Sequence, residues 1–356
     1  MVVAIVAVFA VVIALTWGRD MPTGADTEKI DIDDTSNDTE TEPLDIITDI
    51  VSDTGDIDTQ PPPPTDENEK KQAQLDKCVD EISLWINDAV PRYEKAEETD
   101  VEGNVIVPAE LYSPPVAFFY QDLYSGCTME YNADRVFYTA SIIKEPYVMW
   151  ALCEIEKAEY EGVTEGTKFD LGSTFIYTED KFKSGSGIIQ KSEFGTEYSY
   201  YDLLRLAITQ SDNVAFAELR NIYGRKGFNE FSAELGVSST IKSLYRASAR
   251  EMGVYLNKTF DFFQSGTKYS KDLKSWMLST NHRIMIPSAV TPKKAANKYG
   301  WDLEAYHDMA IVFGEKPYLL VVMTELDKGS RADNAFIRDL VKKIDNAHSM
   351  IICAEE

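Results

Sequence analysis

The chain has 356 residues and a formal net charge of −25 at pH 7, and this charge is unevenly distributed. Residues 20–69 contain 17 Asp and Glu residues against one Lys, which gives −16 of the total. Such an acidic stretch repels phosphate backbones and argues against a nucleic-acid partner. It also has too little apolar surface to offset the entropy of ordering. We therefore expect residues 20–71 to form an acidic disordered linker, stiffened locally by the prolines at 61–64.

The N-terminus carries a segment of a different kind. Residues 2–17 form an apolar run that is closed by Gly18, Arg19 and Asp20. This run is slightly shorter than the roughly 20 residues of a typical membrane-spanning helix. It fits two interpretations, a membrane anchor or the apolar core of a cleaved signal peptide. The long linker and the lack of a small-x-small cleavage site favour the anchor. Under either interpretation, residues 1–19 direct the export of the protein.

Residues 72–356 are numerous and apolar enough to form one large domain with a substantial core. Helical periodicity is found at 72–95, 141–158, 199–222, 225–235, 247–257, 270–280 and 335–352. Strand patterns are found at 116–121, 127–131, 309–313 and 318–324. Strands towards both ends with helices between them predict an antiparallel sheet built from both ends of the domain, plus an inserted helical subdomain.

The first candidate functional residues are Ser141 and Lys144. They lie three residues apart at the start of a predicted helix, so their side chains share one face. A serine hydroxyl is a poor nucleophile until a base takes its proton, and a desolvated lysine can be that base. The spacing alone is weak, because it also occurs at Ser239 and Ser265. Ser141 differs from these in its context, since a predicted strand pair precedes it and an apolar helix follows.

The second candidate is the tripeptide Ser211-Asp212-Asn213, which follows an amphipathic helical run. Taken alone, it fits a helix cap or an Asx turn, because these residue types favour such positions. Its place downstream of a Ser-x-x-Lys helix favours a functional role instead.

Together these motifs resemble class A β-lactamases and penicillin-binding proteins. The signature of these families is Ser-x-x-Lys, then Ser-Asp-Asn, then a Lys-Thr-Gly strand. The third element resembles Lys298-Tyr299-Gly300-Trp301, which precedes the predicted strand at 306–312. The similarity covers about residues 72–352. It implies an α/β (α+β) fold, an αβα sandwich with an antiparallel sheet plus a helical subdomain, and a site in the cleft between them.

The resemblance also implies a role for each matched residue. Ser141 would attack a carbonyl carbon and form an acyl-enzyme, with Lys144 as its base. Ser211 would relay a proton to the leaving nitrogen, and Asn213 would hold the substrate and orient Lys144. On the third element, Lys298 would attract a substrate carboxylate. The oxyanion hole would consist of the backbone N–H groups of Ser141 and Trp301, next to Tyr299 and Gly300.

Two departures from the family pattern bear on the substrate. Tyr299 stands where the family has a Thr or Ser whose hydroxyl helps to bind the substrate carboxylate. The nearby Lys293 and Lys294 leave a second register open for this motif. The loop that carries the deacylating glutamate of class A β-lactamases is also short here, because residues 238–247 alone separate two predicted elements. The other acids of this region are expected on solvent-facing helices: Glu218, Glu230, Glu234 and Glu251.

Other patterns favour structural interpretations. His307-Asp308 begins a strand, and Ser184-Gly185-Ser186-Gly187 is expected to be a loop at the rim of the cleft. No cofactor or metal is expected, since three histidines offer little to a zinc site. Export permits a disulfide between Cys78 and Cys353, but free buried thiols remain the alternative.

The sequence therefore predicts an extracytoplasmic serine hydrolase or acyl-transferase that acts on a β-lactam or peptidoglycan-type amide. Two alternatives remain open, an efficient class A-like β-lactamase and a non-catalytic cell-wall binding or sensor module. The expected location is the cell membrane, with a single span, or the exterior if the N-terminal segment is cleaved. The expected partners are that substrate and, through the N-terminal segment, the membrane.

Overall fold

The computed structural model describes residues 66–95, 97–99, 101–102, 105–107, 110–302 and 305–353. The predicted anchor at 1–19 and most of the predicted linker lie outside these residues. Over the part of the chain that is described, no helix combines the length and the apolarity needed to span a bilayer.

Helix α2, Asp66–Ala89, corrects the expected boundary between linker and domain. The charge of residues 66–71 predicts a continuation of the linker, but these residues form the first turns of the helix. Asp66, Glu67 and Glu69 lie at the positive end of the helix dipole, where acidic side chains are stabilising. Lys71 is buried and lies 3.2 Å from Glu67. The acidity of this short stretch therefore supports a helix start.

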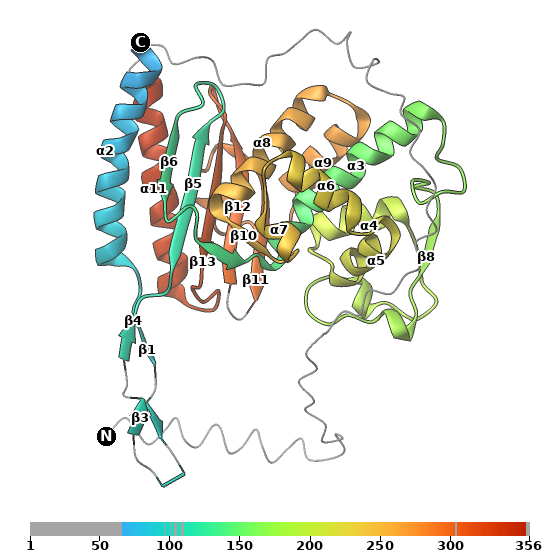
Figure 1. Ribbon diagram of the computed structural model, residues 1–356, viewed down its shortest axis with the longest axis horizontal. Coiled ribbons are helices and arrows are strands. Elements are labelled where there is room, and N and C mark those ends of the chain that lie inside the picture. Colours follow the sequence, from blue (N-terminus) through green and yellow to red (C-terminus); the bar gives the residue numbers. More distant parts are fainter. Residues whose placement is uncertain are drawn as a thin grey trace. The chain divides into compact units, whose positions relative to one another are not determined.

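The central sheet has five strands in the order β11-β12-β13-β5-β6, and each neighbouring pair is antiparallel. These strands come from both ends of the domain, as expected from the sequence (Figure 1). They are β5 (Val116–Asp122), β6 (Thr128–Tyr131), β11 (Lys294–Asp302), β12 (Ala305–Phe313) and β13 (Tyr318–Thr324). Strand β11 lies at one edge of the sheet, next to the short helix η1 (Ala140–Ile143) that contains Ser141.

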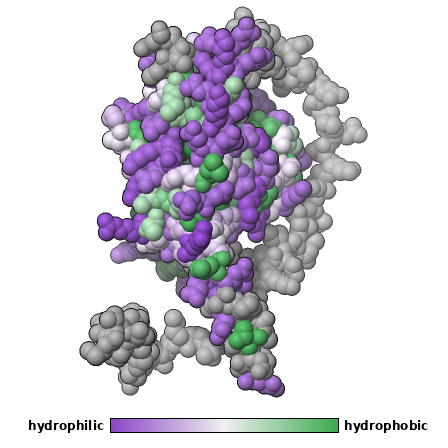
Figure 2. Space-filling view, turned by 90° about the vertical axis from the view of Figure 1, so that its left-hand side faces the viewer, coloured by the Kyte–Doolittle hydropathy of each residue, from purple (hydrophilic) through white to green (hydrophobic). Residues whose placement is uncertain are grey.

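Helices cover both faces of the sheet. Side chains of β5 alternate between two cores: Phe118 and Tyr120 face α2 and α11 (Arg331–Cys353), whereas Phe119 faces α8 (Ala249–Ser265). This αβα arrangement matches the predicted fold class. The side of the molecule formed by α2 and α11 is mainly hydrophilic towards solvent (Figure 2).

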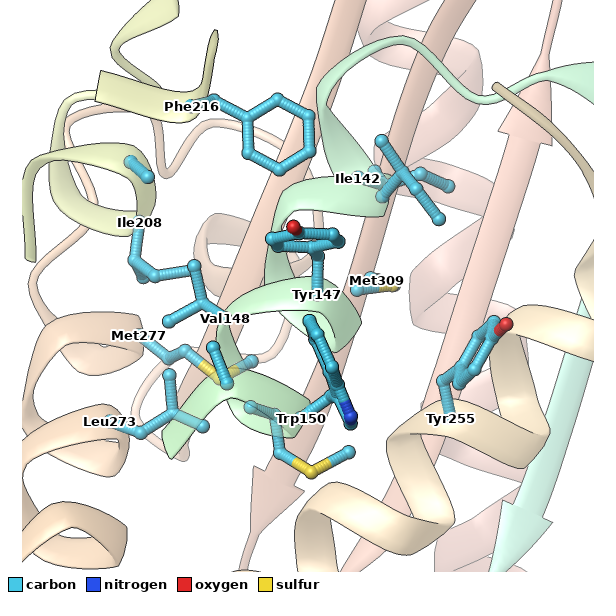
Figure 3. Close-up of a cluster of buried hydrophobic side chains, with 14 of the residues drawn as sticks. Ile142, Tyr147, Val148, Trp150, Ile208, Phe216, Tyr255, Leu273, Met277 and Met309 are labelled. Carbon is cyan, nitrogen blue, oxygen red and sulfur yellow. The ribbon is translucent and has the colours of Figure 1, made fainter. Parts of the chain in front are cut away.

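The helical subdomain lies between β7 (Val136–Tyr138) and β11 in the sequence. Its helices are α3 (Lys144–Glu161), α4 (Tyr200–Thr209), α5 (Asn213–Tyr223), α6 (Lys226–Glu234), α7 (Ser239–Lys242) and α9 (Lys268–Leu278). Helix α3 is buried along most of its length, and Tyr147, Val148 and Trp150 pack within a cluster of apolar side chains (Figure 3). The Ser-x-x-Lys motif thus lies at the start of a buried helix.

The helix predicted at 199–222 is two helices, α4 and α5. It breaks at Ser211, whose φ of 52° is left-handed, and at Asp212, which caps α5 by accepting a hydrogen bond from the backbone N–H of Ala215. Local side-chain to backbone bonds of this kind compete with helix continuation.

The remaining elements are short. Two-stranded pairs are β1 (Tyr93–Lys95) with β4 (Glu110–Tyr112), β2 (Glu98–Thr99) with β3 (Val105–Val107), β7 (Val136–Tyr138) with β10 (Arg246–Ser248), and β8 (Thr174–Ile176) with β9 (Glu197–Ser199). Short helices are η1 (Ala140–Ile143), η2 (Glu179–Lys181), η3 (Ile189–Lys191) and α10 (Ile286–Ala289).

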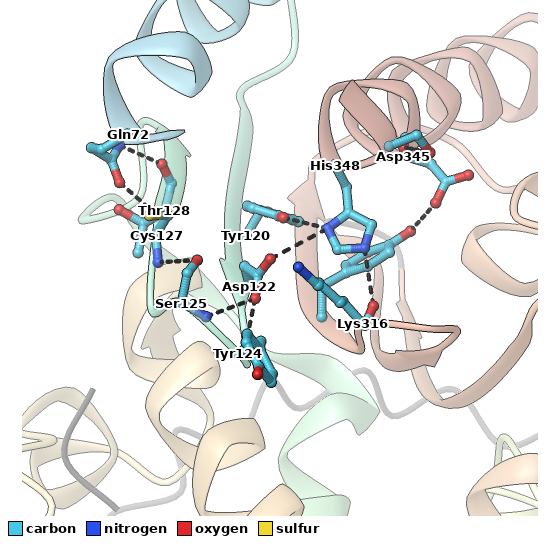
Figure 4. Close-up of polar contacts among 12 residues, drawn as sticks. Gln72, Tyr120, Asp122, Tyr124, Ser125, Cys127, Thr128, Lys316, Asp345 and His348 are labelled. Carbon is cyan, nitrogen blue, oxygen red and sulfur yellow. Dashed lines mark hydrogen bonds and ion pairs between the residues drawn. The ribbon is translucent and has the colours of Figure 1, made fainter. Parts of the chain in front are cut away.

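Polar contacts tie the outer helices to the sheet (Figure 4). Gln72 of α2 pairs with the backbone of Thr128, donating to its carbonyl at 2.8 Å and accepting from its N–H at 2.9 Å. His348 of α11 lies 2.7 Å from the hydroxyl of Tyr120. Cys78, Cys127 and Cys153 are free thiols, so Cys78 forms no disulfide; the side chain of Cys353 lies outside the described residues.

Candidate active site

Ser141 lies in the 3₁₀ turn η1, directly before α3, and its side chain lines a cavity of about 600 Å³. The preceding residue, Ala140, has a φ of 46°, a left-handed conformation that is unfavourable for a residue with a Cβ. Strand β11 holds this turn from the other side. A Cβ added to Gly300 would lie 2.9 Å from the backbone N of Ile142 and 3.0 Å from that of Ser141. Glycine therefore allows β11 to approach the backbone of the nucleophile.

Lys144 is buried one helical turn beyond Ser141 and lines the same cavity. Its Nζ atom donates hydrogen bonds to the carbonyl of Ser211 at 2.6 Å and to Oδ1 of Asn213 at 2.7 Å. Burial lowers its pKa to about 7; the negative charge of Asp212 opposes this shift and the positive charge of Arg220 adds to it. A large fraction of Lys144 is thus neutral at pH 7. The two acceptors occupy two N–H bonds, which leaves the lone pair of the neutral amine for a proton.

The Ser-Asp-Asn segment joins α4 to α5, and of its three residues Asn213 lines the cavity. Ser211 is fully buried. One carboxylate oxygen of Asp212 caps α5, and the other accepts hydrogen bonds from the backbone of Ile188 at 2.6 Å and Ile189 at 2.9 Å. Asp212 thus positions the two polar residues on either side of it.

The segment Ser184-Gly185-Ser186-Gly187 lies against this motif. Asn213 donates from Nδ2 to the carbonyl of Ser184 at 2.8 Å and from its backbone N to that of Ser186 at 3.0 Å. Gly185 and Gly187 have φ values of 100° and 120°, and a Cβ at Gly187 would overlap the carboxylate of Asp212. The segment lines the cavity, in agreement with the expected loop at the rim.

On β11, Lys298 reaches the site and the neighbouring lysines do not. Its Nζ atom donates to Oγ of Ser211 at 3.0 Å and to the carbonyl of Tyr299 at 2.8 Å. Lys293 instead pairs with Asp345 at 2.5 Å, and Lys294 is exposed. Burial, and then the charge of Lys144, hold the pKa of Lys298 well below its usual value. The register that places Lys298 at the site is the one the structure adopts.

Tyr299 and Lys298 do not line the cavity, although the sequence predicts that both contact substrate. Lys298 is fully buried and Tyr299 is 6% exposed. The ring of Tyr299 lies 4.3 Å from Nζ of Lys298, and its hydroxyl points towards Ser211, Ser186 and Asn281. The phenol therefore fills the space beside Lys298.

The cavity is also lined by residues that were not singled out from the sequence patterns described above. Phe216 and Arg220 follow Asn213 along one face of α5, and helical spacing could have indicated them. Tyr138 is the last residue of β7, and Tyr245 directly precedes β10, with which β7 pairs. This pairing joins distant parts of the chain and leaves no local signal in the sequence. Trp301, which was predicted, is half exposed at the entrance.

None of the described residues that line the cavity is a glutamate. Among the described residues that line it, Asp302 is the one carboxylate. Glu251 forms a capping box with Ser248 and also accepts from the backbone of Ser239, so it is partly buried rather than solvent-facing as expected. Glu218 is likewise partly buried, 3.5 Å from Lys181, whereas Glu230 and Glu234 are exposed, as expected.

His307 and Asp308 have structural roles. His307 bridges the carbonyl of Tyr138 and the backbone N–H of Thr324, and Asp308 accepts from Nδ2 of Asn297 at 2.9 Å. Both are fully buried within β12, in agreement with the predicted strand.

An αβα sandwich with a Ser-x-x-Lys turn, a Ser-Asp-Asn loop and a lysine strand around one cavity defines a β-lactamase-like serine hydrolase. Residues 104–347 match the beta-lactamase enzyme family. This match covers more than half of the chain, and the protein belongs to that family. No curated protein sequence matches the chain.

Solved structures share the fold at low sequence identity. One is a mutant of PBP-A in an acyl-enzyme complex with penicillin G: TM-score 0.59, 18% identity, covering 78% of this chain and 97% of that one. A second is the β-lactamase from Sphaerobacter thermophilus, with TM-score 0.58 and 17% identity, covering 78% and 98%. A third is a class A β-lactamase from Mycobacterium abscessus, with TM-score 0.58 and 17% identity, covering 76% and 99%.

Proposed function

We propose that this protein is an extracytoplasmic serine acyl-transferase or hydrolase that forms a slowly hydrolysed acyl-enzyme at Ser141. Its substrate would be a β-lactam or a peptidoglycan-type amide. The observation that carries this proposal is Lys144, a buried amine one turn from Ser141 with a pKa near 7 and two fixed acceptors.

Acylation would proceed by attack of Oγ of Ser141 on the carbonyl carbon, while its proton passes to neutral Lys144. The backbone N–H groups of Ser141 and Trp301 would stabilise the negative oxygen that develops. The C–N bond then breaks, and Ser211 donates its proton to the leaving nitrogen. Lys298, 3.0 Å from Oγ of Ser211, would support this transfer by stabilising the alkoxide that forms.

Deacylation requires a second base to activate water or an amine acceptor. In class A enzymes this base is a glutamate, and no glutamate lines the described part of the cavity. Arg220 lies there instead, and a cation cannot accept a proton from water. This favours a long-lived acyl-enzyme, and hence cell-wall acyl transfer, over an efficient β-lactamase.

A time course with a fluorescent penicillin tests this proposal. The full-length protein, its Ser141→Ala variant and an untreated control would be followed for hours by gel fluorescence and intact-protein mass. We expect an adduct that persists and that is lost in the variant. An adduct that clears within seconds would indicate an efficient β-lactamase. An adduct that is unchanged in Ser141→Ala would refute the proposed nucleophile.

The location is tested separately. If residues 2–17 anchor the protein with its domain outside, protease added to intact cells should degrade the domain, and the protein should sediment with membranes. A domain protected from protease in intact cells, and degraded only after lysis, would contradict an extracytoplasmic enzyme.

A further inference from the structure

A site that binds a carboxylate on the leaving group needs a cation that faces the cavity beside that group. The charges around this cavity do not meet this requirement. Ser211, the residue proposed to protonate the leaving nitrogen, defines where the leaving group lies. The cation on that side is Lys298, which is fully buried and directs its N–H bonds to Ser211 and to the carbonyl of Tyr299. Its ammonium does not line the cavity.

Tyr299 blocks access from the cavity to Lys298. Its ring lies 4.3 Å from the Lys298 nitrogen on one side and 4.5 Å from the ring of His282 on the other. Its hydroxyl points towards Ser211, Ser186 and Asn281. A carboxylate could reach Lys298 only by displacing this phenol.

Positive charge faces the cavity on the wall formed by α5 and Tyr245. Arg220 lies seven residues after Asn213 on α5, about 10 Å along the helix axis. Its guanidinium carbon lies 5.7 Å from the ring centres of both Phe216 and Tyr245, so two aromatic rings restrict its position. Lys183 adds a second cation to the wall. A substrate whose leaving group lies beside Ser211 would extend its acyl half along α5 towards Arg220.

We infer that the site selects acyl donors that carry a carboxylate on the acyl half, and that Arg220 is the specificity-determining residue. Guanidinium binds carboxylate in a bidentate, charge-assisted way that a neutral isostere cannot reproduce. This inference rests on the proposed acylation of Ser141 and adds the substrate class. The ligand chemistry is an acidic acyl group, as in a peptide with a free side-chain carboxylate.

Two matched pairs of thioesters test the inference on the full-length protein. In the first pair, the acyl half ends in a carboxylate or in the isosteric carboxamide. In the second pair, the leaving thiol carries either a carboxylate or the isosteric carboxamide. Acylation releases the thiol and forms an ester at Ser141, so its second-order rate constant is measured from thiol release and checked by intact mass.

For the wild type we expect a preference of about tenfold or more for the carboxylate in the first pair, and little preference in the second. Arg220→Gln should lose most of the first preference and Arg220→Lys should keep part of it. Arg205→Gln is the matched control, because Arg205 forms a surface ion pair with Asp202 and does not line the cavity. Tyr299→Thr should create a preference for the carboxylate in the second pair by opening the way to Lys298.

Equal rates within the first pair, or a preference that survives Arg220→Gln, would overturn the role of Arg220. A wild-type preference for the leaving thiol that carries a carboxylate would refute the claim that Tyr299 blocks access to Lys298. If no thioester acylates Ser141, the proposed function is refuted, but the inference about Arg220 is still open to a separate test. The first pair is then titrated calorimetrically into Ser141→Ala with and without Arg220→Gln. Selective binding of the carboxylate that requires Arg220 supports the inference, and unselective or absent binding refutes it.

Discussion

Nζ of Lys144 lies 2.7 Å from Oδ1 of Asn213, and this contact joins the start of α3 to the start of α5. The amide of Asn213 is itself fixed, because its Nδ2 donates to the carbonyl of Ser184. A buried amine with a lowered pKa is therefore held in one position, one helical turn from Ser141. Such a group can act as a general base once the serine hydroxyl comes within hydrogen-bond reach.

The first prediction concerns this base. Because burial lowers the pKa of Lys144 to about 7, and only the neutral amine accepts a proton, the acylation rate should rise as pH increases through about 7. Lys144→Ala should reduce the rate by about 10²–10⁴-fold. The second-order rate constant from about pH 5.5 to about pH 9 measures both effects. A flat profile in the wild type would rule out Lys144 as the base.

The second prediction concerns Gly300. An added Cβ would crowd the backbone of Ile142, Thr139 and Ser141, so Gly300→Ala should push β11 away from the nucleophile turn. We expect acylation to fall by about 10²-fold, since misplacement by about 1 Å can have that effect. Gly314→Ala is the control, because its nearest neighbour would lie 3.8 Å away. Equal rates for both variants would show that β11 does not shape the site.

The third prediction concerns the loop at the cavity rim. Gly187 combines a φ of 120° with a Cβ position 2.7 Å from Cα of Asp212, so Gly187→Ala should destabilise the fold by about 2 kcal/mol or more. Gly166→Ala has a φ of 70° but open space around the new Cβ, and should cost about 1–2 kcal/mol. Chemical denaturation compares the two. A smaller loss at Gly187 than at Gly166 would contradict the described contact with Asp212.

The fourth prediction uses Glu145, a buried carboxyl outside the proposed mechanism. Burial raises its pKa to about 8, although the hydroxyl of Thr259 and the charge of Lys298 act in the opposite direction. The folded protein thus holds a proton that the unfolded chain releases near pH 4.5. The contribution of this group to stability is complete below that pH and is lost as pH rises towards 8.

Glu145→Gln removes this proton linkage. Relative to wild type, the variant should gain at least about 1 kcal/mol of unfolding free energy at about pH 8, and less at about pH 5. Urea denaturation at both pH values measures the difference, with exposed Glu161→Gln at the end of the same helix as the control. A gain that is independent of pH would show that Glu145 is ionised in the folded state.

Much of the fold was predictable because its signals are local. The apolar strands, the amphipathic helices and the Ser-x-x-Lys and Ser-Asp-Asn motifs lie in short stretches of sequence. The break at Ser211 was missed because a left-handed residue inside an otherwise helical pattern is set by the capping of Asp212 and by packing. The start of α2 was missed because acidic residues indicate both a linker and a helix N-terminus.

The site was predictable in its motifs but not in its walls. Tyr138 and Tyr245 meet through strands that pair from distant parts of the chain. The orientation of Lys298 was also hidden, because a strand residue can face the cavity or the interior depending on register and on its neighbours. The position of Tyr299, between Lys298 and His282, decides this, and it depends on three-dimensional packing.

The central claim is that Ser141 becomes acylated, and peptide mapping tests it most directly. Tryptic cleavage after Arg135 and Lys144 releases residues 136–144, in which Ser141 is the one serine. After incubation with the fluorescent penicillin, the mass of the antibiotic should be found on this peptide, with fragment ions that place it on Ser141. An adduct on any other peptide, or an unmodified peptide alongside a labelled intact protein, would contradict the account.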